Sequence, residues 1–196
     1  MPVAVRQGYP VKSLAHLGSQ AASLPLAADD ILEFHAARLL LLMHVCGTSG
    51  RIDGLTKMAK LDFFTRYPDF FEVARAAIEP SAAVPPGAND AVESSMVRHH
   101  YGPWDKRYYQ VLGSLEAKQL ITVTKHKQSF QIALSPLGKE RAKALAARRS
   151  FQDLIARQRE VKKAFGSKSG TFLKDLIYRL FDKEVSKRTL GQVITR

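Results

Sequence analysis

The sequence has a single cysteine, Cys46, among its 196 residues. An internal disulfide therefore cannot form, and a cysteine-based zinc site would lack its ligands. Apolar runs are short as well, since the longest, residues 39–43, is far below the roughly 20 residues that a membrane span needs. The first thirty residues contain no compact apolar stretch ahead of a small-residue cleavage site. We therefore expect a cytoplasmic protein without a signal peptide or membrane contact.

The sequence also lacks the motifs that mark common enzyme classes. It has no Gly-rich phosphate loop, no nucleophile elbow and no paired-carboxylate motif. His99 and His100 are neighbours, but adjacent residues of a strand point to opposite faces, so they are poorly placed to bind one metal ion. We expect no catalytic residues, no metal and no cofactor, with an undetected hydrolase or nuclease as the alternative.

Four other residues, Asp62, His35, His44 and Cys46, are of the types that occur in catalytic sites. Asp62 could pair with His35 or His44 only through a contact that folding creates. Its spacing of four positions from Arg66 instead favours an ion pair on one helix. Cys46 ends an apolar helical segment, so it is expected in the core rather than as a nucleophile.

Charge is distributed unevenly along the chain. Residues 1–100 carry 9 basic and 10 acidic side chains, a net charge of −1, whereas residues 101–196 carry 21 and 8, a net charge of +13, which together give +12. A neutral half joined to a basic half suggests that one region faces a polyanion, with nucleic acid as the first candidate. The alternatives are an ordinary solvated basic surface and an acidic protein partner.

Apolar residues at helical spacing, together with caps and breakers, predict a mainly helical chain. The predicted helices cover about 31–46, 55–66, 69–78, 105–118, 136–165 and 171–183. A short strand is expected over 96–101, before Gly102 and Pro103 force a turn. Two β-prone runs, 120–124 and 129–134, flank the basic turn 125–128 and predict a β-hairpin with a charged tip. Asp53, Asp105 and Ser135 are the expected caps of the helices that follow them.

Three groups of apolar residues are expected to form most of the core. The run 39–43 covers more than one face of its helix, so that helix should lie at the centre. The other two groups are stripes on the helices 105–118 and 171–183. They consist of Tyr108, Val111, Leu112 and Leu115, and of Phe172, Leu173, Leu176, Ile177 and Leu180.

The order of the predicted elements is that of a winged helix. The fold class is therefore mainly α (α+β), with a β-hairpin wing and additional C-terminal helices. We expect a flexible N-terminal arm over 1–28, a winged-helix domain over 29–147 and a C-terminal helical extension over 148–196 that could serve a dimer or a partner. In a winged helix, the helix before the hairpin enters the major groove and the hairpin tip contacts a phosphate or the minor groove.

The candidate DNA-binding residues lie on that helix, at the hairpin tip and at a basic pair further on. Arginine and lysine can donate to phosphate or guanine, and glutamine can pair with adenine. An ordinary solvated helix face, and a hairpin kept soluble by charge, would show the same pattern. The candidates are Lys106, Arg107, Gln110, Ser114, Lys118, Lys125, His126, Lys127, Arg148 and Arg149.

Two segments are more specific than these patterns. Residues 54–68 have the sequence GLTKMAKLDFFTRYP, and residues 97–121 have the sequence VRHHYGPWDKRYYQVLGSLEAKQLI. They resemble the KLDF-x-x-RYP and R-x-x-YGPWD-x-x-Y stretches of the middle component of bacterial three-component ABC-ATPase systems, the Lamassu-like anti-phage and anti-plasmid defence modules. The resemblance covers about residues 31–145 and departs at Met58, where a leucine is expected.

The resemblance implies a small non-catalytic winged-helix subunit. It would join a coiled-coil ATPase of the structural-maintenance-of-chromosomes (SMC) type to an effector, often a nuclease. The basic residues add double-stranded DNA as a further expected partner. The motif residues would organise the domain or its subunit contacts. They are Lys57, Lys60, Asp62, Arg66, Tyr67, Arg98, Tyr101, Trp104 and Tyr108. The competing hypothesis is a stand-alone winged-helix transcription regulator that binds a palindrome as a dimer.

Overall fold

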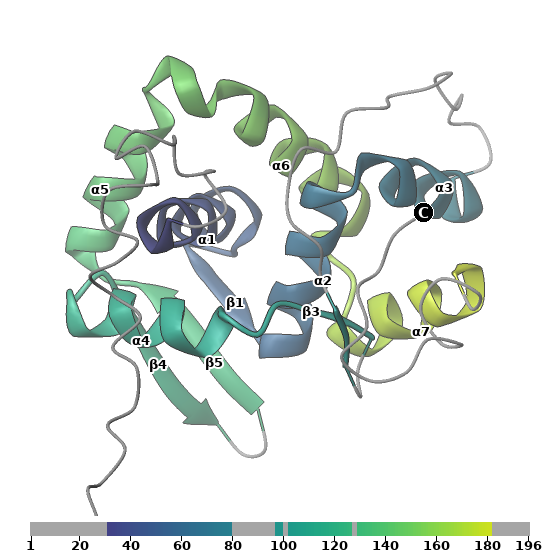
Figure 1. Cartoon of the computed structure of the whole chain (residues 1–196), viewed down its shortest axis with the longest axis horizontal. Helices are drawn as coiled ribbons and strands as arrows, with labels where there is room; N and C mark the ends of the chain where they lie inside the picture. Colours follow the sequence, from purple (N-terminus) through teal and green to yellow (C-terminus); the bar gives the residue numbers. More distant parts are fainter. Residues whose placement is uncertain (1–30, 80–96, 100–101, 127–128, 182–196) are drawn as a thin grey trace, which may run out of the picture.

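The computed structural model describes residues 31–79, 97–99, 102–126 and 129–181. The predicted arm, the predicted loop around residues 80–90 and Lys127 lie outside these ranges. The described part is mainly helical, with a small antiparallel sheet, as expected (Figure 1). Its elements are α1 (Leu32–Cys46), β1 (Arg51–Asp53), α2 (Leu55–Arg66), α3 (Pro68–Ile78), β2 (Val97–His99), β3 (Gly102–Trp104), α4 (Tyr108–Ala117), β4 (Ile121–His126), β5 (Ser129–Leu134), α5 (Pro136–Ala146), a 3₁₀ turn (Arg149–Phe151), α6 (Gln152–Phe165) and α7 (Gly170–Leu180).

The main sheet has the strand order β1-β5-β4, and every neighbouring pair is antiparallel. The predicted hairpin is confirmed, because β4 and β5 pair from Ile121 opposite Leu134 to His126 opposite Ser129. Strand β1 was not predicted; residues 51–53 were assigned to a turn. In the structure Ile52 lies opposite Ile132, and both side chains are buried. Strand β1, which follows α1, therefore shares one buried face with the hairpin.

Two other local predictions were wrong. Gly102 and Pro103 lie in β3, which pairs with β2, and not in a turn. A proline is tolerated there because this ribbon has only two strands, so each strand has an edge that needs no donor. The helix expected over 136–165 is interrupted between α5 and α6. The side-chain amide of Gln152 donates to the carbonyl oxygens of Ala146 and Arg148 and bridges the break.

Helix α1 lies at the centre of the molecule, as predicted (Figure 1). It is seen nearly end-on, with α5, α6, α2 and α4 arranged around it, and it contacts all four. The side chains of residues 39–43 are at most 2 % exposed. A helix surrounded in this way needs apolar side chains on several faces, which accounts for the run of leucines.

An aromatic cluster fills the space between α2, α3, α6 and α7. The ring of Phe165 lies 4.5 Å from that of Phe64 and 5.5 Å from that of Phe71. The ring of Phe181 lies 4.6 Å from that of Phe70. Because Phe165 and Phe181 both follow residue 148, the last helices pack into the same core as α2 and α3. On α7 the buried residues are as predicted except Phe172, which is 39 % exposed, and Leu180, which is partly buried.

The predicted caps had different outcomes. Ser135 caps α5, because its hydroxyl oxygen accepts from the backbone N–H of Gly138 at 2.9 Å. Asp105 accepts from the backbone N–H of Arg107, but the N-cap position of α4 is Arg107 and no side chain caps this helix, so the predicted cap is wrong. Asp53 does not cap α2, since it lies in β1 and the residue preceding the helix is Gly54. Among the described residues, no helix is long and apolar enough to cross a membrane.

Candidate functional site

The two motif segments are in direct contact. The hydroxyl of Tyr108, at the start of α4, donates to Asp62 on α2 over 2.7 Å. Lys60 donates from Nζ to the carbonyl oxygen of Pro103 at 2.9 Å. Both side chains on α2 are completely buried. Residues 54–68 and the described part of 98–108 therefore form one structural unit that holds the start of α4 against α2.

Beneath this contact lies an ionic cluster, which we define as Arg38, Asp62, Arg66, Asp105 and Arg107. Arg38 donates from Nε to one oxygen of Asp62 at 2.9 Å and from Nη2 to the other at 3.2 Å. Arg66 and Arg107 each donate to Oδ2 of Asp105 at 2.9 Å. The side chains of Arg38, Asp62 and Arg66 are at most 1 % exposed. The cluster thus ties α1, α2 and the segment before α4 together.

The predicted ion pair between Asp62 and Arg66 is present, but at 3.9 Å it is the longer of two contacts. Asp105, which sequence reasoning treated only as a helix cap, is the closer partner of Arg66. Within the cluster, three guanidinium groups face two carboxylates. Loss of either carboxylate would therefore leave buried positive charge with less compensation.

Burial and the surrounding charges shift the pKa values of two members of this unit. Burial alone would raise the pKa of Asp105, but hydrogen bonds from Arg107 and the charges of Arg66 and Arg107 hold it well below its usual range. Burial, followed by the negative charge of Asp62, raises the pKa of Tyr108 well above its usual value. Asp105 therefore stays ionised and Tyr108 stays a hydrogen-bond donor across the physiological pH range.

His35 lies between two arginines. Its Nδ1 is 2.7 Å from Nη1 of Arg38, and its Nε2 is 2.7 Å from Nη1 of Arg107. A neutral imidazole has one acceptor nitrogen and one N–H, so it can accept from only one of these groups, and a cationic ring could accept from neither. With both nitrogens facing arginines and 1 % of the residue exposed, His35 is placed to pack the cluster rather than to exchange protons with a substrate.

Lys60 gives the protein a pH-dependent contribution to stability. Burial, with a smaller effect from the charge of Lys174, lowers the pKa of Lys60 from 10.5 to about 7. Below pH 7 the lysine is protonated in the folded and unfolded chains alike, so the full cost of burying its charge applies. Above pH 7 the folded protein has released this proton and the unfolded chain still binds it, so this contribution to the free energy of unfolding rises with pH.

We therefore expect a difference in urea unfolding between the natural protein and Lys60→Met. Measured at intervals between about pH 7 and pH 9, the free energy of unfolding of the natural protein should increase relative to that of the variant. Other titrating groups are common to both proteins and cancel in the difference. A difference that stays constant over this interval would show that the pKa of Lys60 is not lowered.

The remaining motif residues also have structural contacts. Lys57 donates from Nζ to the carbonyl oxygen of Gly166 at 2.8 Å, which links α2 to the end of α6. Tyr67 is 8 % exposed, and its ring lies 5.1 Å from that of Phe63. Trp104 is 5 % exposed and packs edge-on against Tyr108. Arg98 lies in β2 opposite Pro103, and Tyr101 lies outside the described residues.

Most of the predicted DNA-binding residues lie on the surface. Arg107 is an exception, because its side chain is only 30 % exposed. Its guanidinium group contacts Asp105 and His35. Ser114 is half-buried, and Lys127 lies outside the described residues. The exposed candidates are Lys106, Gln110 and Lys118 on or next to α4, Lys125 and His126 on β4, and Arg148 and Arg149 after α5.

Sequence reasoning missed two exposed aromatic residues beside these candidates. Tyr109 on α4 is 64 % exposed and Phe130 on β5 is 41 % exposed. Both line a groove of about 540 Å³ that also contains Lys57 and Lys174. The sequence could have predicted the exposure of Tyr109. Tyr108 belongs to the buried stripe of this helix, and the next residue of a helix points about 100° away from it. Aromatic and basic side chains together suit nucleic-acid bases and phosphates.

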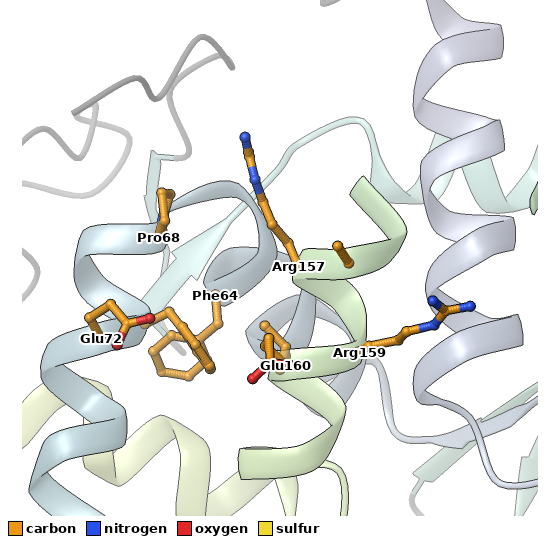
Figure 2. Close-up of a pocket in the computed structure, with 9 residues that line it drawn as sticks. Phe64, Pro68, Glu72, Arg157, Arg159 and Glu160 are labelled. Carbon is orange, nitrogen blue, oxygen red and sulfur yellow. The ribbon is translucent and has the colours of Figure 1, made fainter. Parts of the chain in front are cut away.

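A second groove lies between α3 and α6 and is shown in Figure 2. It has a volume of about 450 Å³ and an apolar floor that includes Phe64 and Phe71. Glu72, Arg157 and Glu160 stand at its edges, whereas the side chain of Arg159 extends away from Phe64 toward the neighbouring helix. Because both signs of charge are present, the groove favours no single class of ligand.

Cys46 is buried, as predicted, and burial raises the pKa of its thiol to about 12. Among the described residues, no three histidine, cysteine, aspartate or glutamate side chains are grouped so that they could hold a metal ion. No family model matches the chain, and no curated protein and no solved structure is similar to it.

Proposed function

We propose that this chain is a non-catalytic winged-helix subunit that lies on double-stranded DNA through α4 and the β4–β5 hairpin. The observation that carries this proposal is the placement of exposed basic and amide side chains on a helix that directly precedes a hairpin. Strand β1 pairs with β5 of that hairpin and completes a three-stranded sheet. In winged-helix proteins this is the arrangement that puts the helix in the major groove and the hairpin on the backbone.

The packing of α4 supports this role. Its apolar stripe, Tyr108, Val111, Leu112 and Leu115, is at most 5 % exposed, so the helix has one fixed inner face. Lys106, Gln110 and Lys118 are exposed, and they supply the donors that phosphate and base edges accept. Lys125 and His126 add positive charge along β4 toward the hairpin tip.

We further propose that the subunit belongs to a Lamassu-like defence complex, where it bridges a coiled-coil SMC-type ATPase and an effector nuclease. This part rests on the resemblance of residues 54–68 and 97–121. It is supported by the contacts between the two segments, since Asp62 with Tyr108 and Arg66 with Asp105 give those motifs a reason to occur together.

Charge reversal on the proposed DNA face should weaken binding and change its salt dependence. We expect Lys106→Glu and Lys125→Glu to lower affinity for all duplex sequences alike. Each lost phosphate contact should reduce the slope of log affinity against log salt by about 0.9. Fluorescence anisotropy of labelled duplexes at several salt concentrations measures both quantities. Lys163→Glu, an exposed residue on α6, makes the same charge change elsewhere and should leave the slope unaltered. A loss confined to one DNA sequence would contradict this picture.

The complex is tested by purifying the tagged protein from its native host and identifying bound proteins by mass spectrometry. Recovery of a large coiled-coil ATPase together with an effector supports the subunit. Recovery of the chain alone, or of a homodimer on one defined DNA site, would instead favour the transcription regulator.

A further inference from the structure

A third groove lies between α1, α5 and the C-terminal end of α4. Its volume is about 310 Å³. Leu40 and Leu115 form the buried part of its floor, and Leu120 and Leu145 are partly exposed along it. None of these side chains takes part in the ionic cluster or in the DNA face proposed above.

The walls of this groove are built from small residues. Ala36 and Ala37 lie on α1, and Ala144 lies on α5. Short side chains on two neighbouring helices leave an open trough, in which another helix can approach closely. The volume is sufficient for the anchoring side chains of such a helix but not for the helix itself. This is the geometry of a helix that lies along a groove and inserts residues at spacings of three and four.

The edge of the groove is basic. Lys118, Arg141 and Arg148 line it, with Glu33 as the one acidic residue among the lining side chains. Within the described ranges, none of these three basic groups has an ion-pair partner. The groove between α3 and α6 differs, because its edges carry both signs of charge. A partner that fits the α1–α5 groove should therefore place apolar side chains on the floor and acidic side chains along the edge.

We infer that the α1–α5 groove binds an amphipathic helix of a partner protein whose apolar face is flanked by glutamate or aspartate. The inference rests on the proposed role as a subunit of a larger complex and assigns Arg148 to that partner rather than to DNA. Lys118 lies where the edge of the groove meets the proposed DNA face. Duplex DNA is the less suitable occupant, because an aliphatic floor offers no hydrogen-bonding group to phosphates or base edges. The exposed aromatics Tyr109 and Phe130 line a different groove.

The test uses the full chain and a labelled synthetic peptide of about 18 residues, with leucines at positions i, i+3, i+4 and i+7 and glutamates beside them. A second peptide has lysine in place of every glutamate. Fluorescence anisotropy should show that the acidic peptide binds and the basic one does not. In Arg141→Glu/Arg148→Glu the affinity for the acidic peptide should fall by about tenfold. The matched control, Arg157→Glu/Lys163→Glu, changes two exposed residues of α6 and should bind like the natural protein.

The occupant is identified by a photo-reactive benzoylphenylalanine at position 144, introduced into the full chain. A cross-link to the acidic peptide supports the proposal. A cross-link to residues 1–30 of the same chain, or to a second copy, would overturn it and give the groove to that occupant. Equal binding of both peptides would also overturn it. If Arg141→Glu/Arg148→Glu loses affinity for DNA but not for the peptide, the groove belongs to nucleic acid. The Lys106 and Lys125 variants test the DNA face separately, so the two proposals can fail independently.

Discussion

Replacing Asp62 by asparagine is expected to lower the free energy of unfolding by about 3–5 kcal/mol. The carboxylate is completely buried and accepts hydrogen bonds from Arg38 and Tyr108. Asparagine has nearly the same shape but carries no charge, so the cluster would hold three guanidinium groups against one carboxylate. The cost arises because buried positive charge loses much of its compensation in a region that excludes water.

Urea unfolding followed by circular dichroism measures this change. The matched control is Asp53→Asn, since Asp53 also pairs with an arginine, Arg51, but both side chains are about half exposed. That surface pair should contribute no more than about 1 kcal/mol. Similar small losses in the two variants would show that the ionic cluster does not stabilise the contact between α1, α2 and α4.

Replacing Gly138 by alanine should destabilise the protein by about 3 kcal/mol or more. A Cβ atom at this position would lie 1.8 Å from the carbonyl oxygen of Leu120. That oxygen belongs to the backbone and also accepts from the N–H of Ser135, so it cannot move away as a flexible side chain could. The start of α5 would have to separate from the start of β4, which would disturb the edge of the sheet.

Gly113 provides a control with the opposite sign. It lies inside α4, and a Cβ atom there would meet no heavy atom within 4 Å. Gly113→Ala should therefore raise the free energy of unfolding by about 0.5–1 kcal/mol, because alanine loses less backbone entropy in a helix. The two alanine variants are compared by urea unfolding under the same conditions. Destabilisation by Gly113→Ala, or tolerance of Gly138→Ala, would contradict the packing described for α4 and α5.

The parts of the fold that depend on local pattern were predicted well. Helix α2 begins and ends at the predicted residues 55 and 66, because Gly54 and Pro68 bracket it. The hairpin was predicted from two β-prone runs that lie next to each other in the chain. Strand β1 was missed because it has only three residues and pairs with β5, which lies far along the sequence. The break between α5 and α6 was missed because residues 146–152 contain neither glycine nor proline.

Only part of the candidate site was predicted, because several of its contacts join residues that lie far apart in the sequence. The motif residues were singled out, but Arg38 was not, since an arginine among leucines looks like a surface position of an apolar helix. Only the approach of Asp62 from another helix makes its burial favourable. Asp105 was interpreted as a cap because its local contact, the backbone N–H of Arg107, is visible from spacing. Its contact with Arg66 depends on the tertiary structure and has no local signal.

The ionic cluster has a consequence for how α4 would recognise DNA. Tyr108 donates to Asp62 on α2, Arg66 donates to Asp105, and Arg38 on α1 pairs with Asp105 at 3.9 Å, so the start of α4 is preorganised before any ligand arrives. A rigid surface loses little conformational entropy on binding, and it cannot reshape itself around different duplexes. Any adjustment then falls to the DNA, whose bending and groove width depend on base sequence. We therefore expect sequence preference to follow the deformability of the duplex more than hydrogen bonds to individual bases.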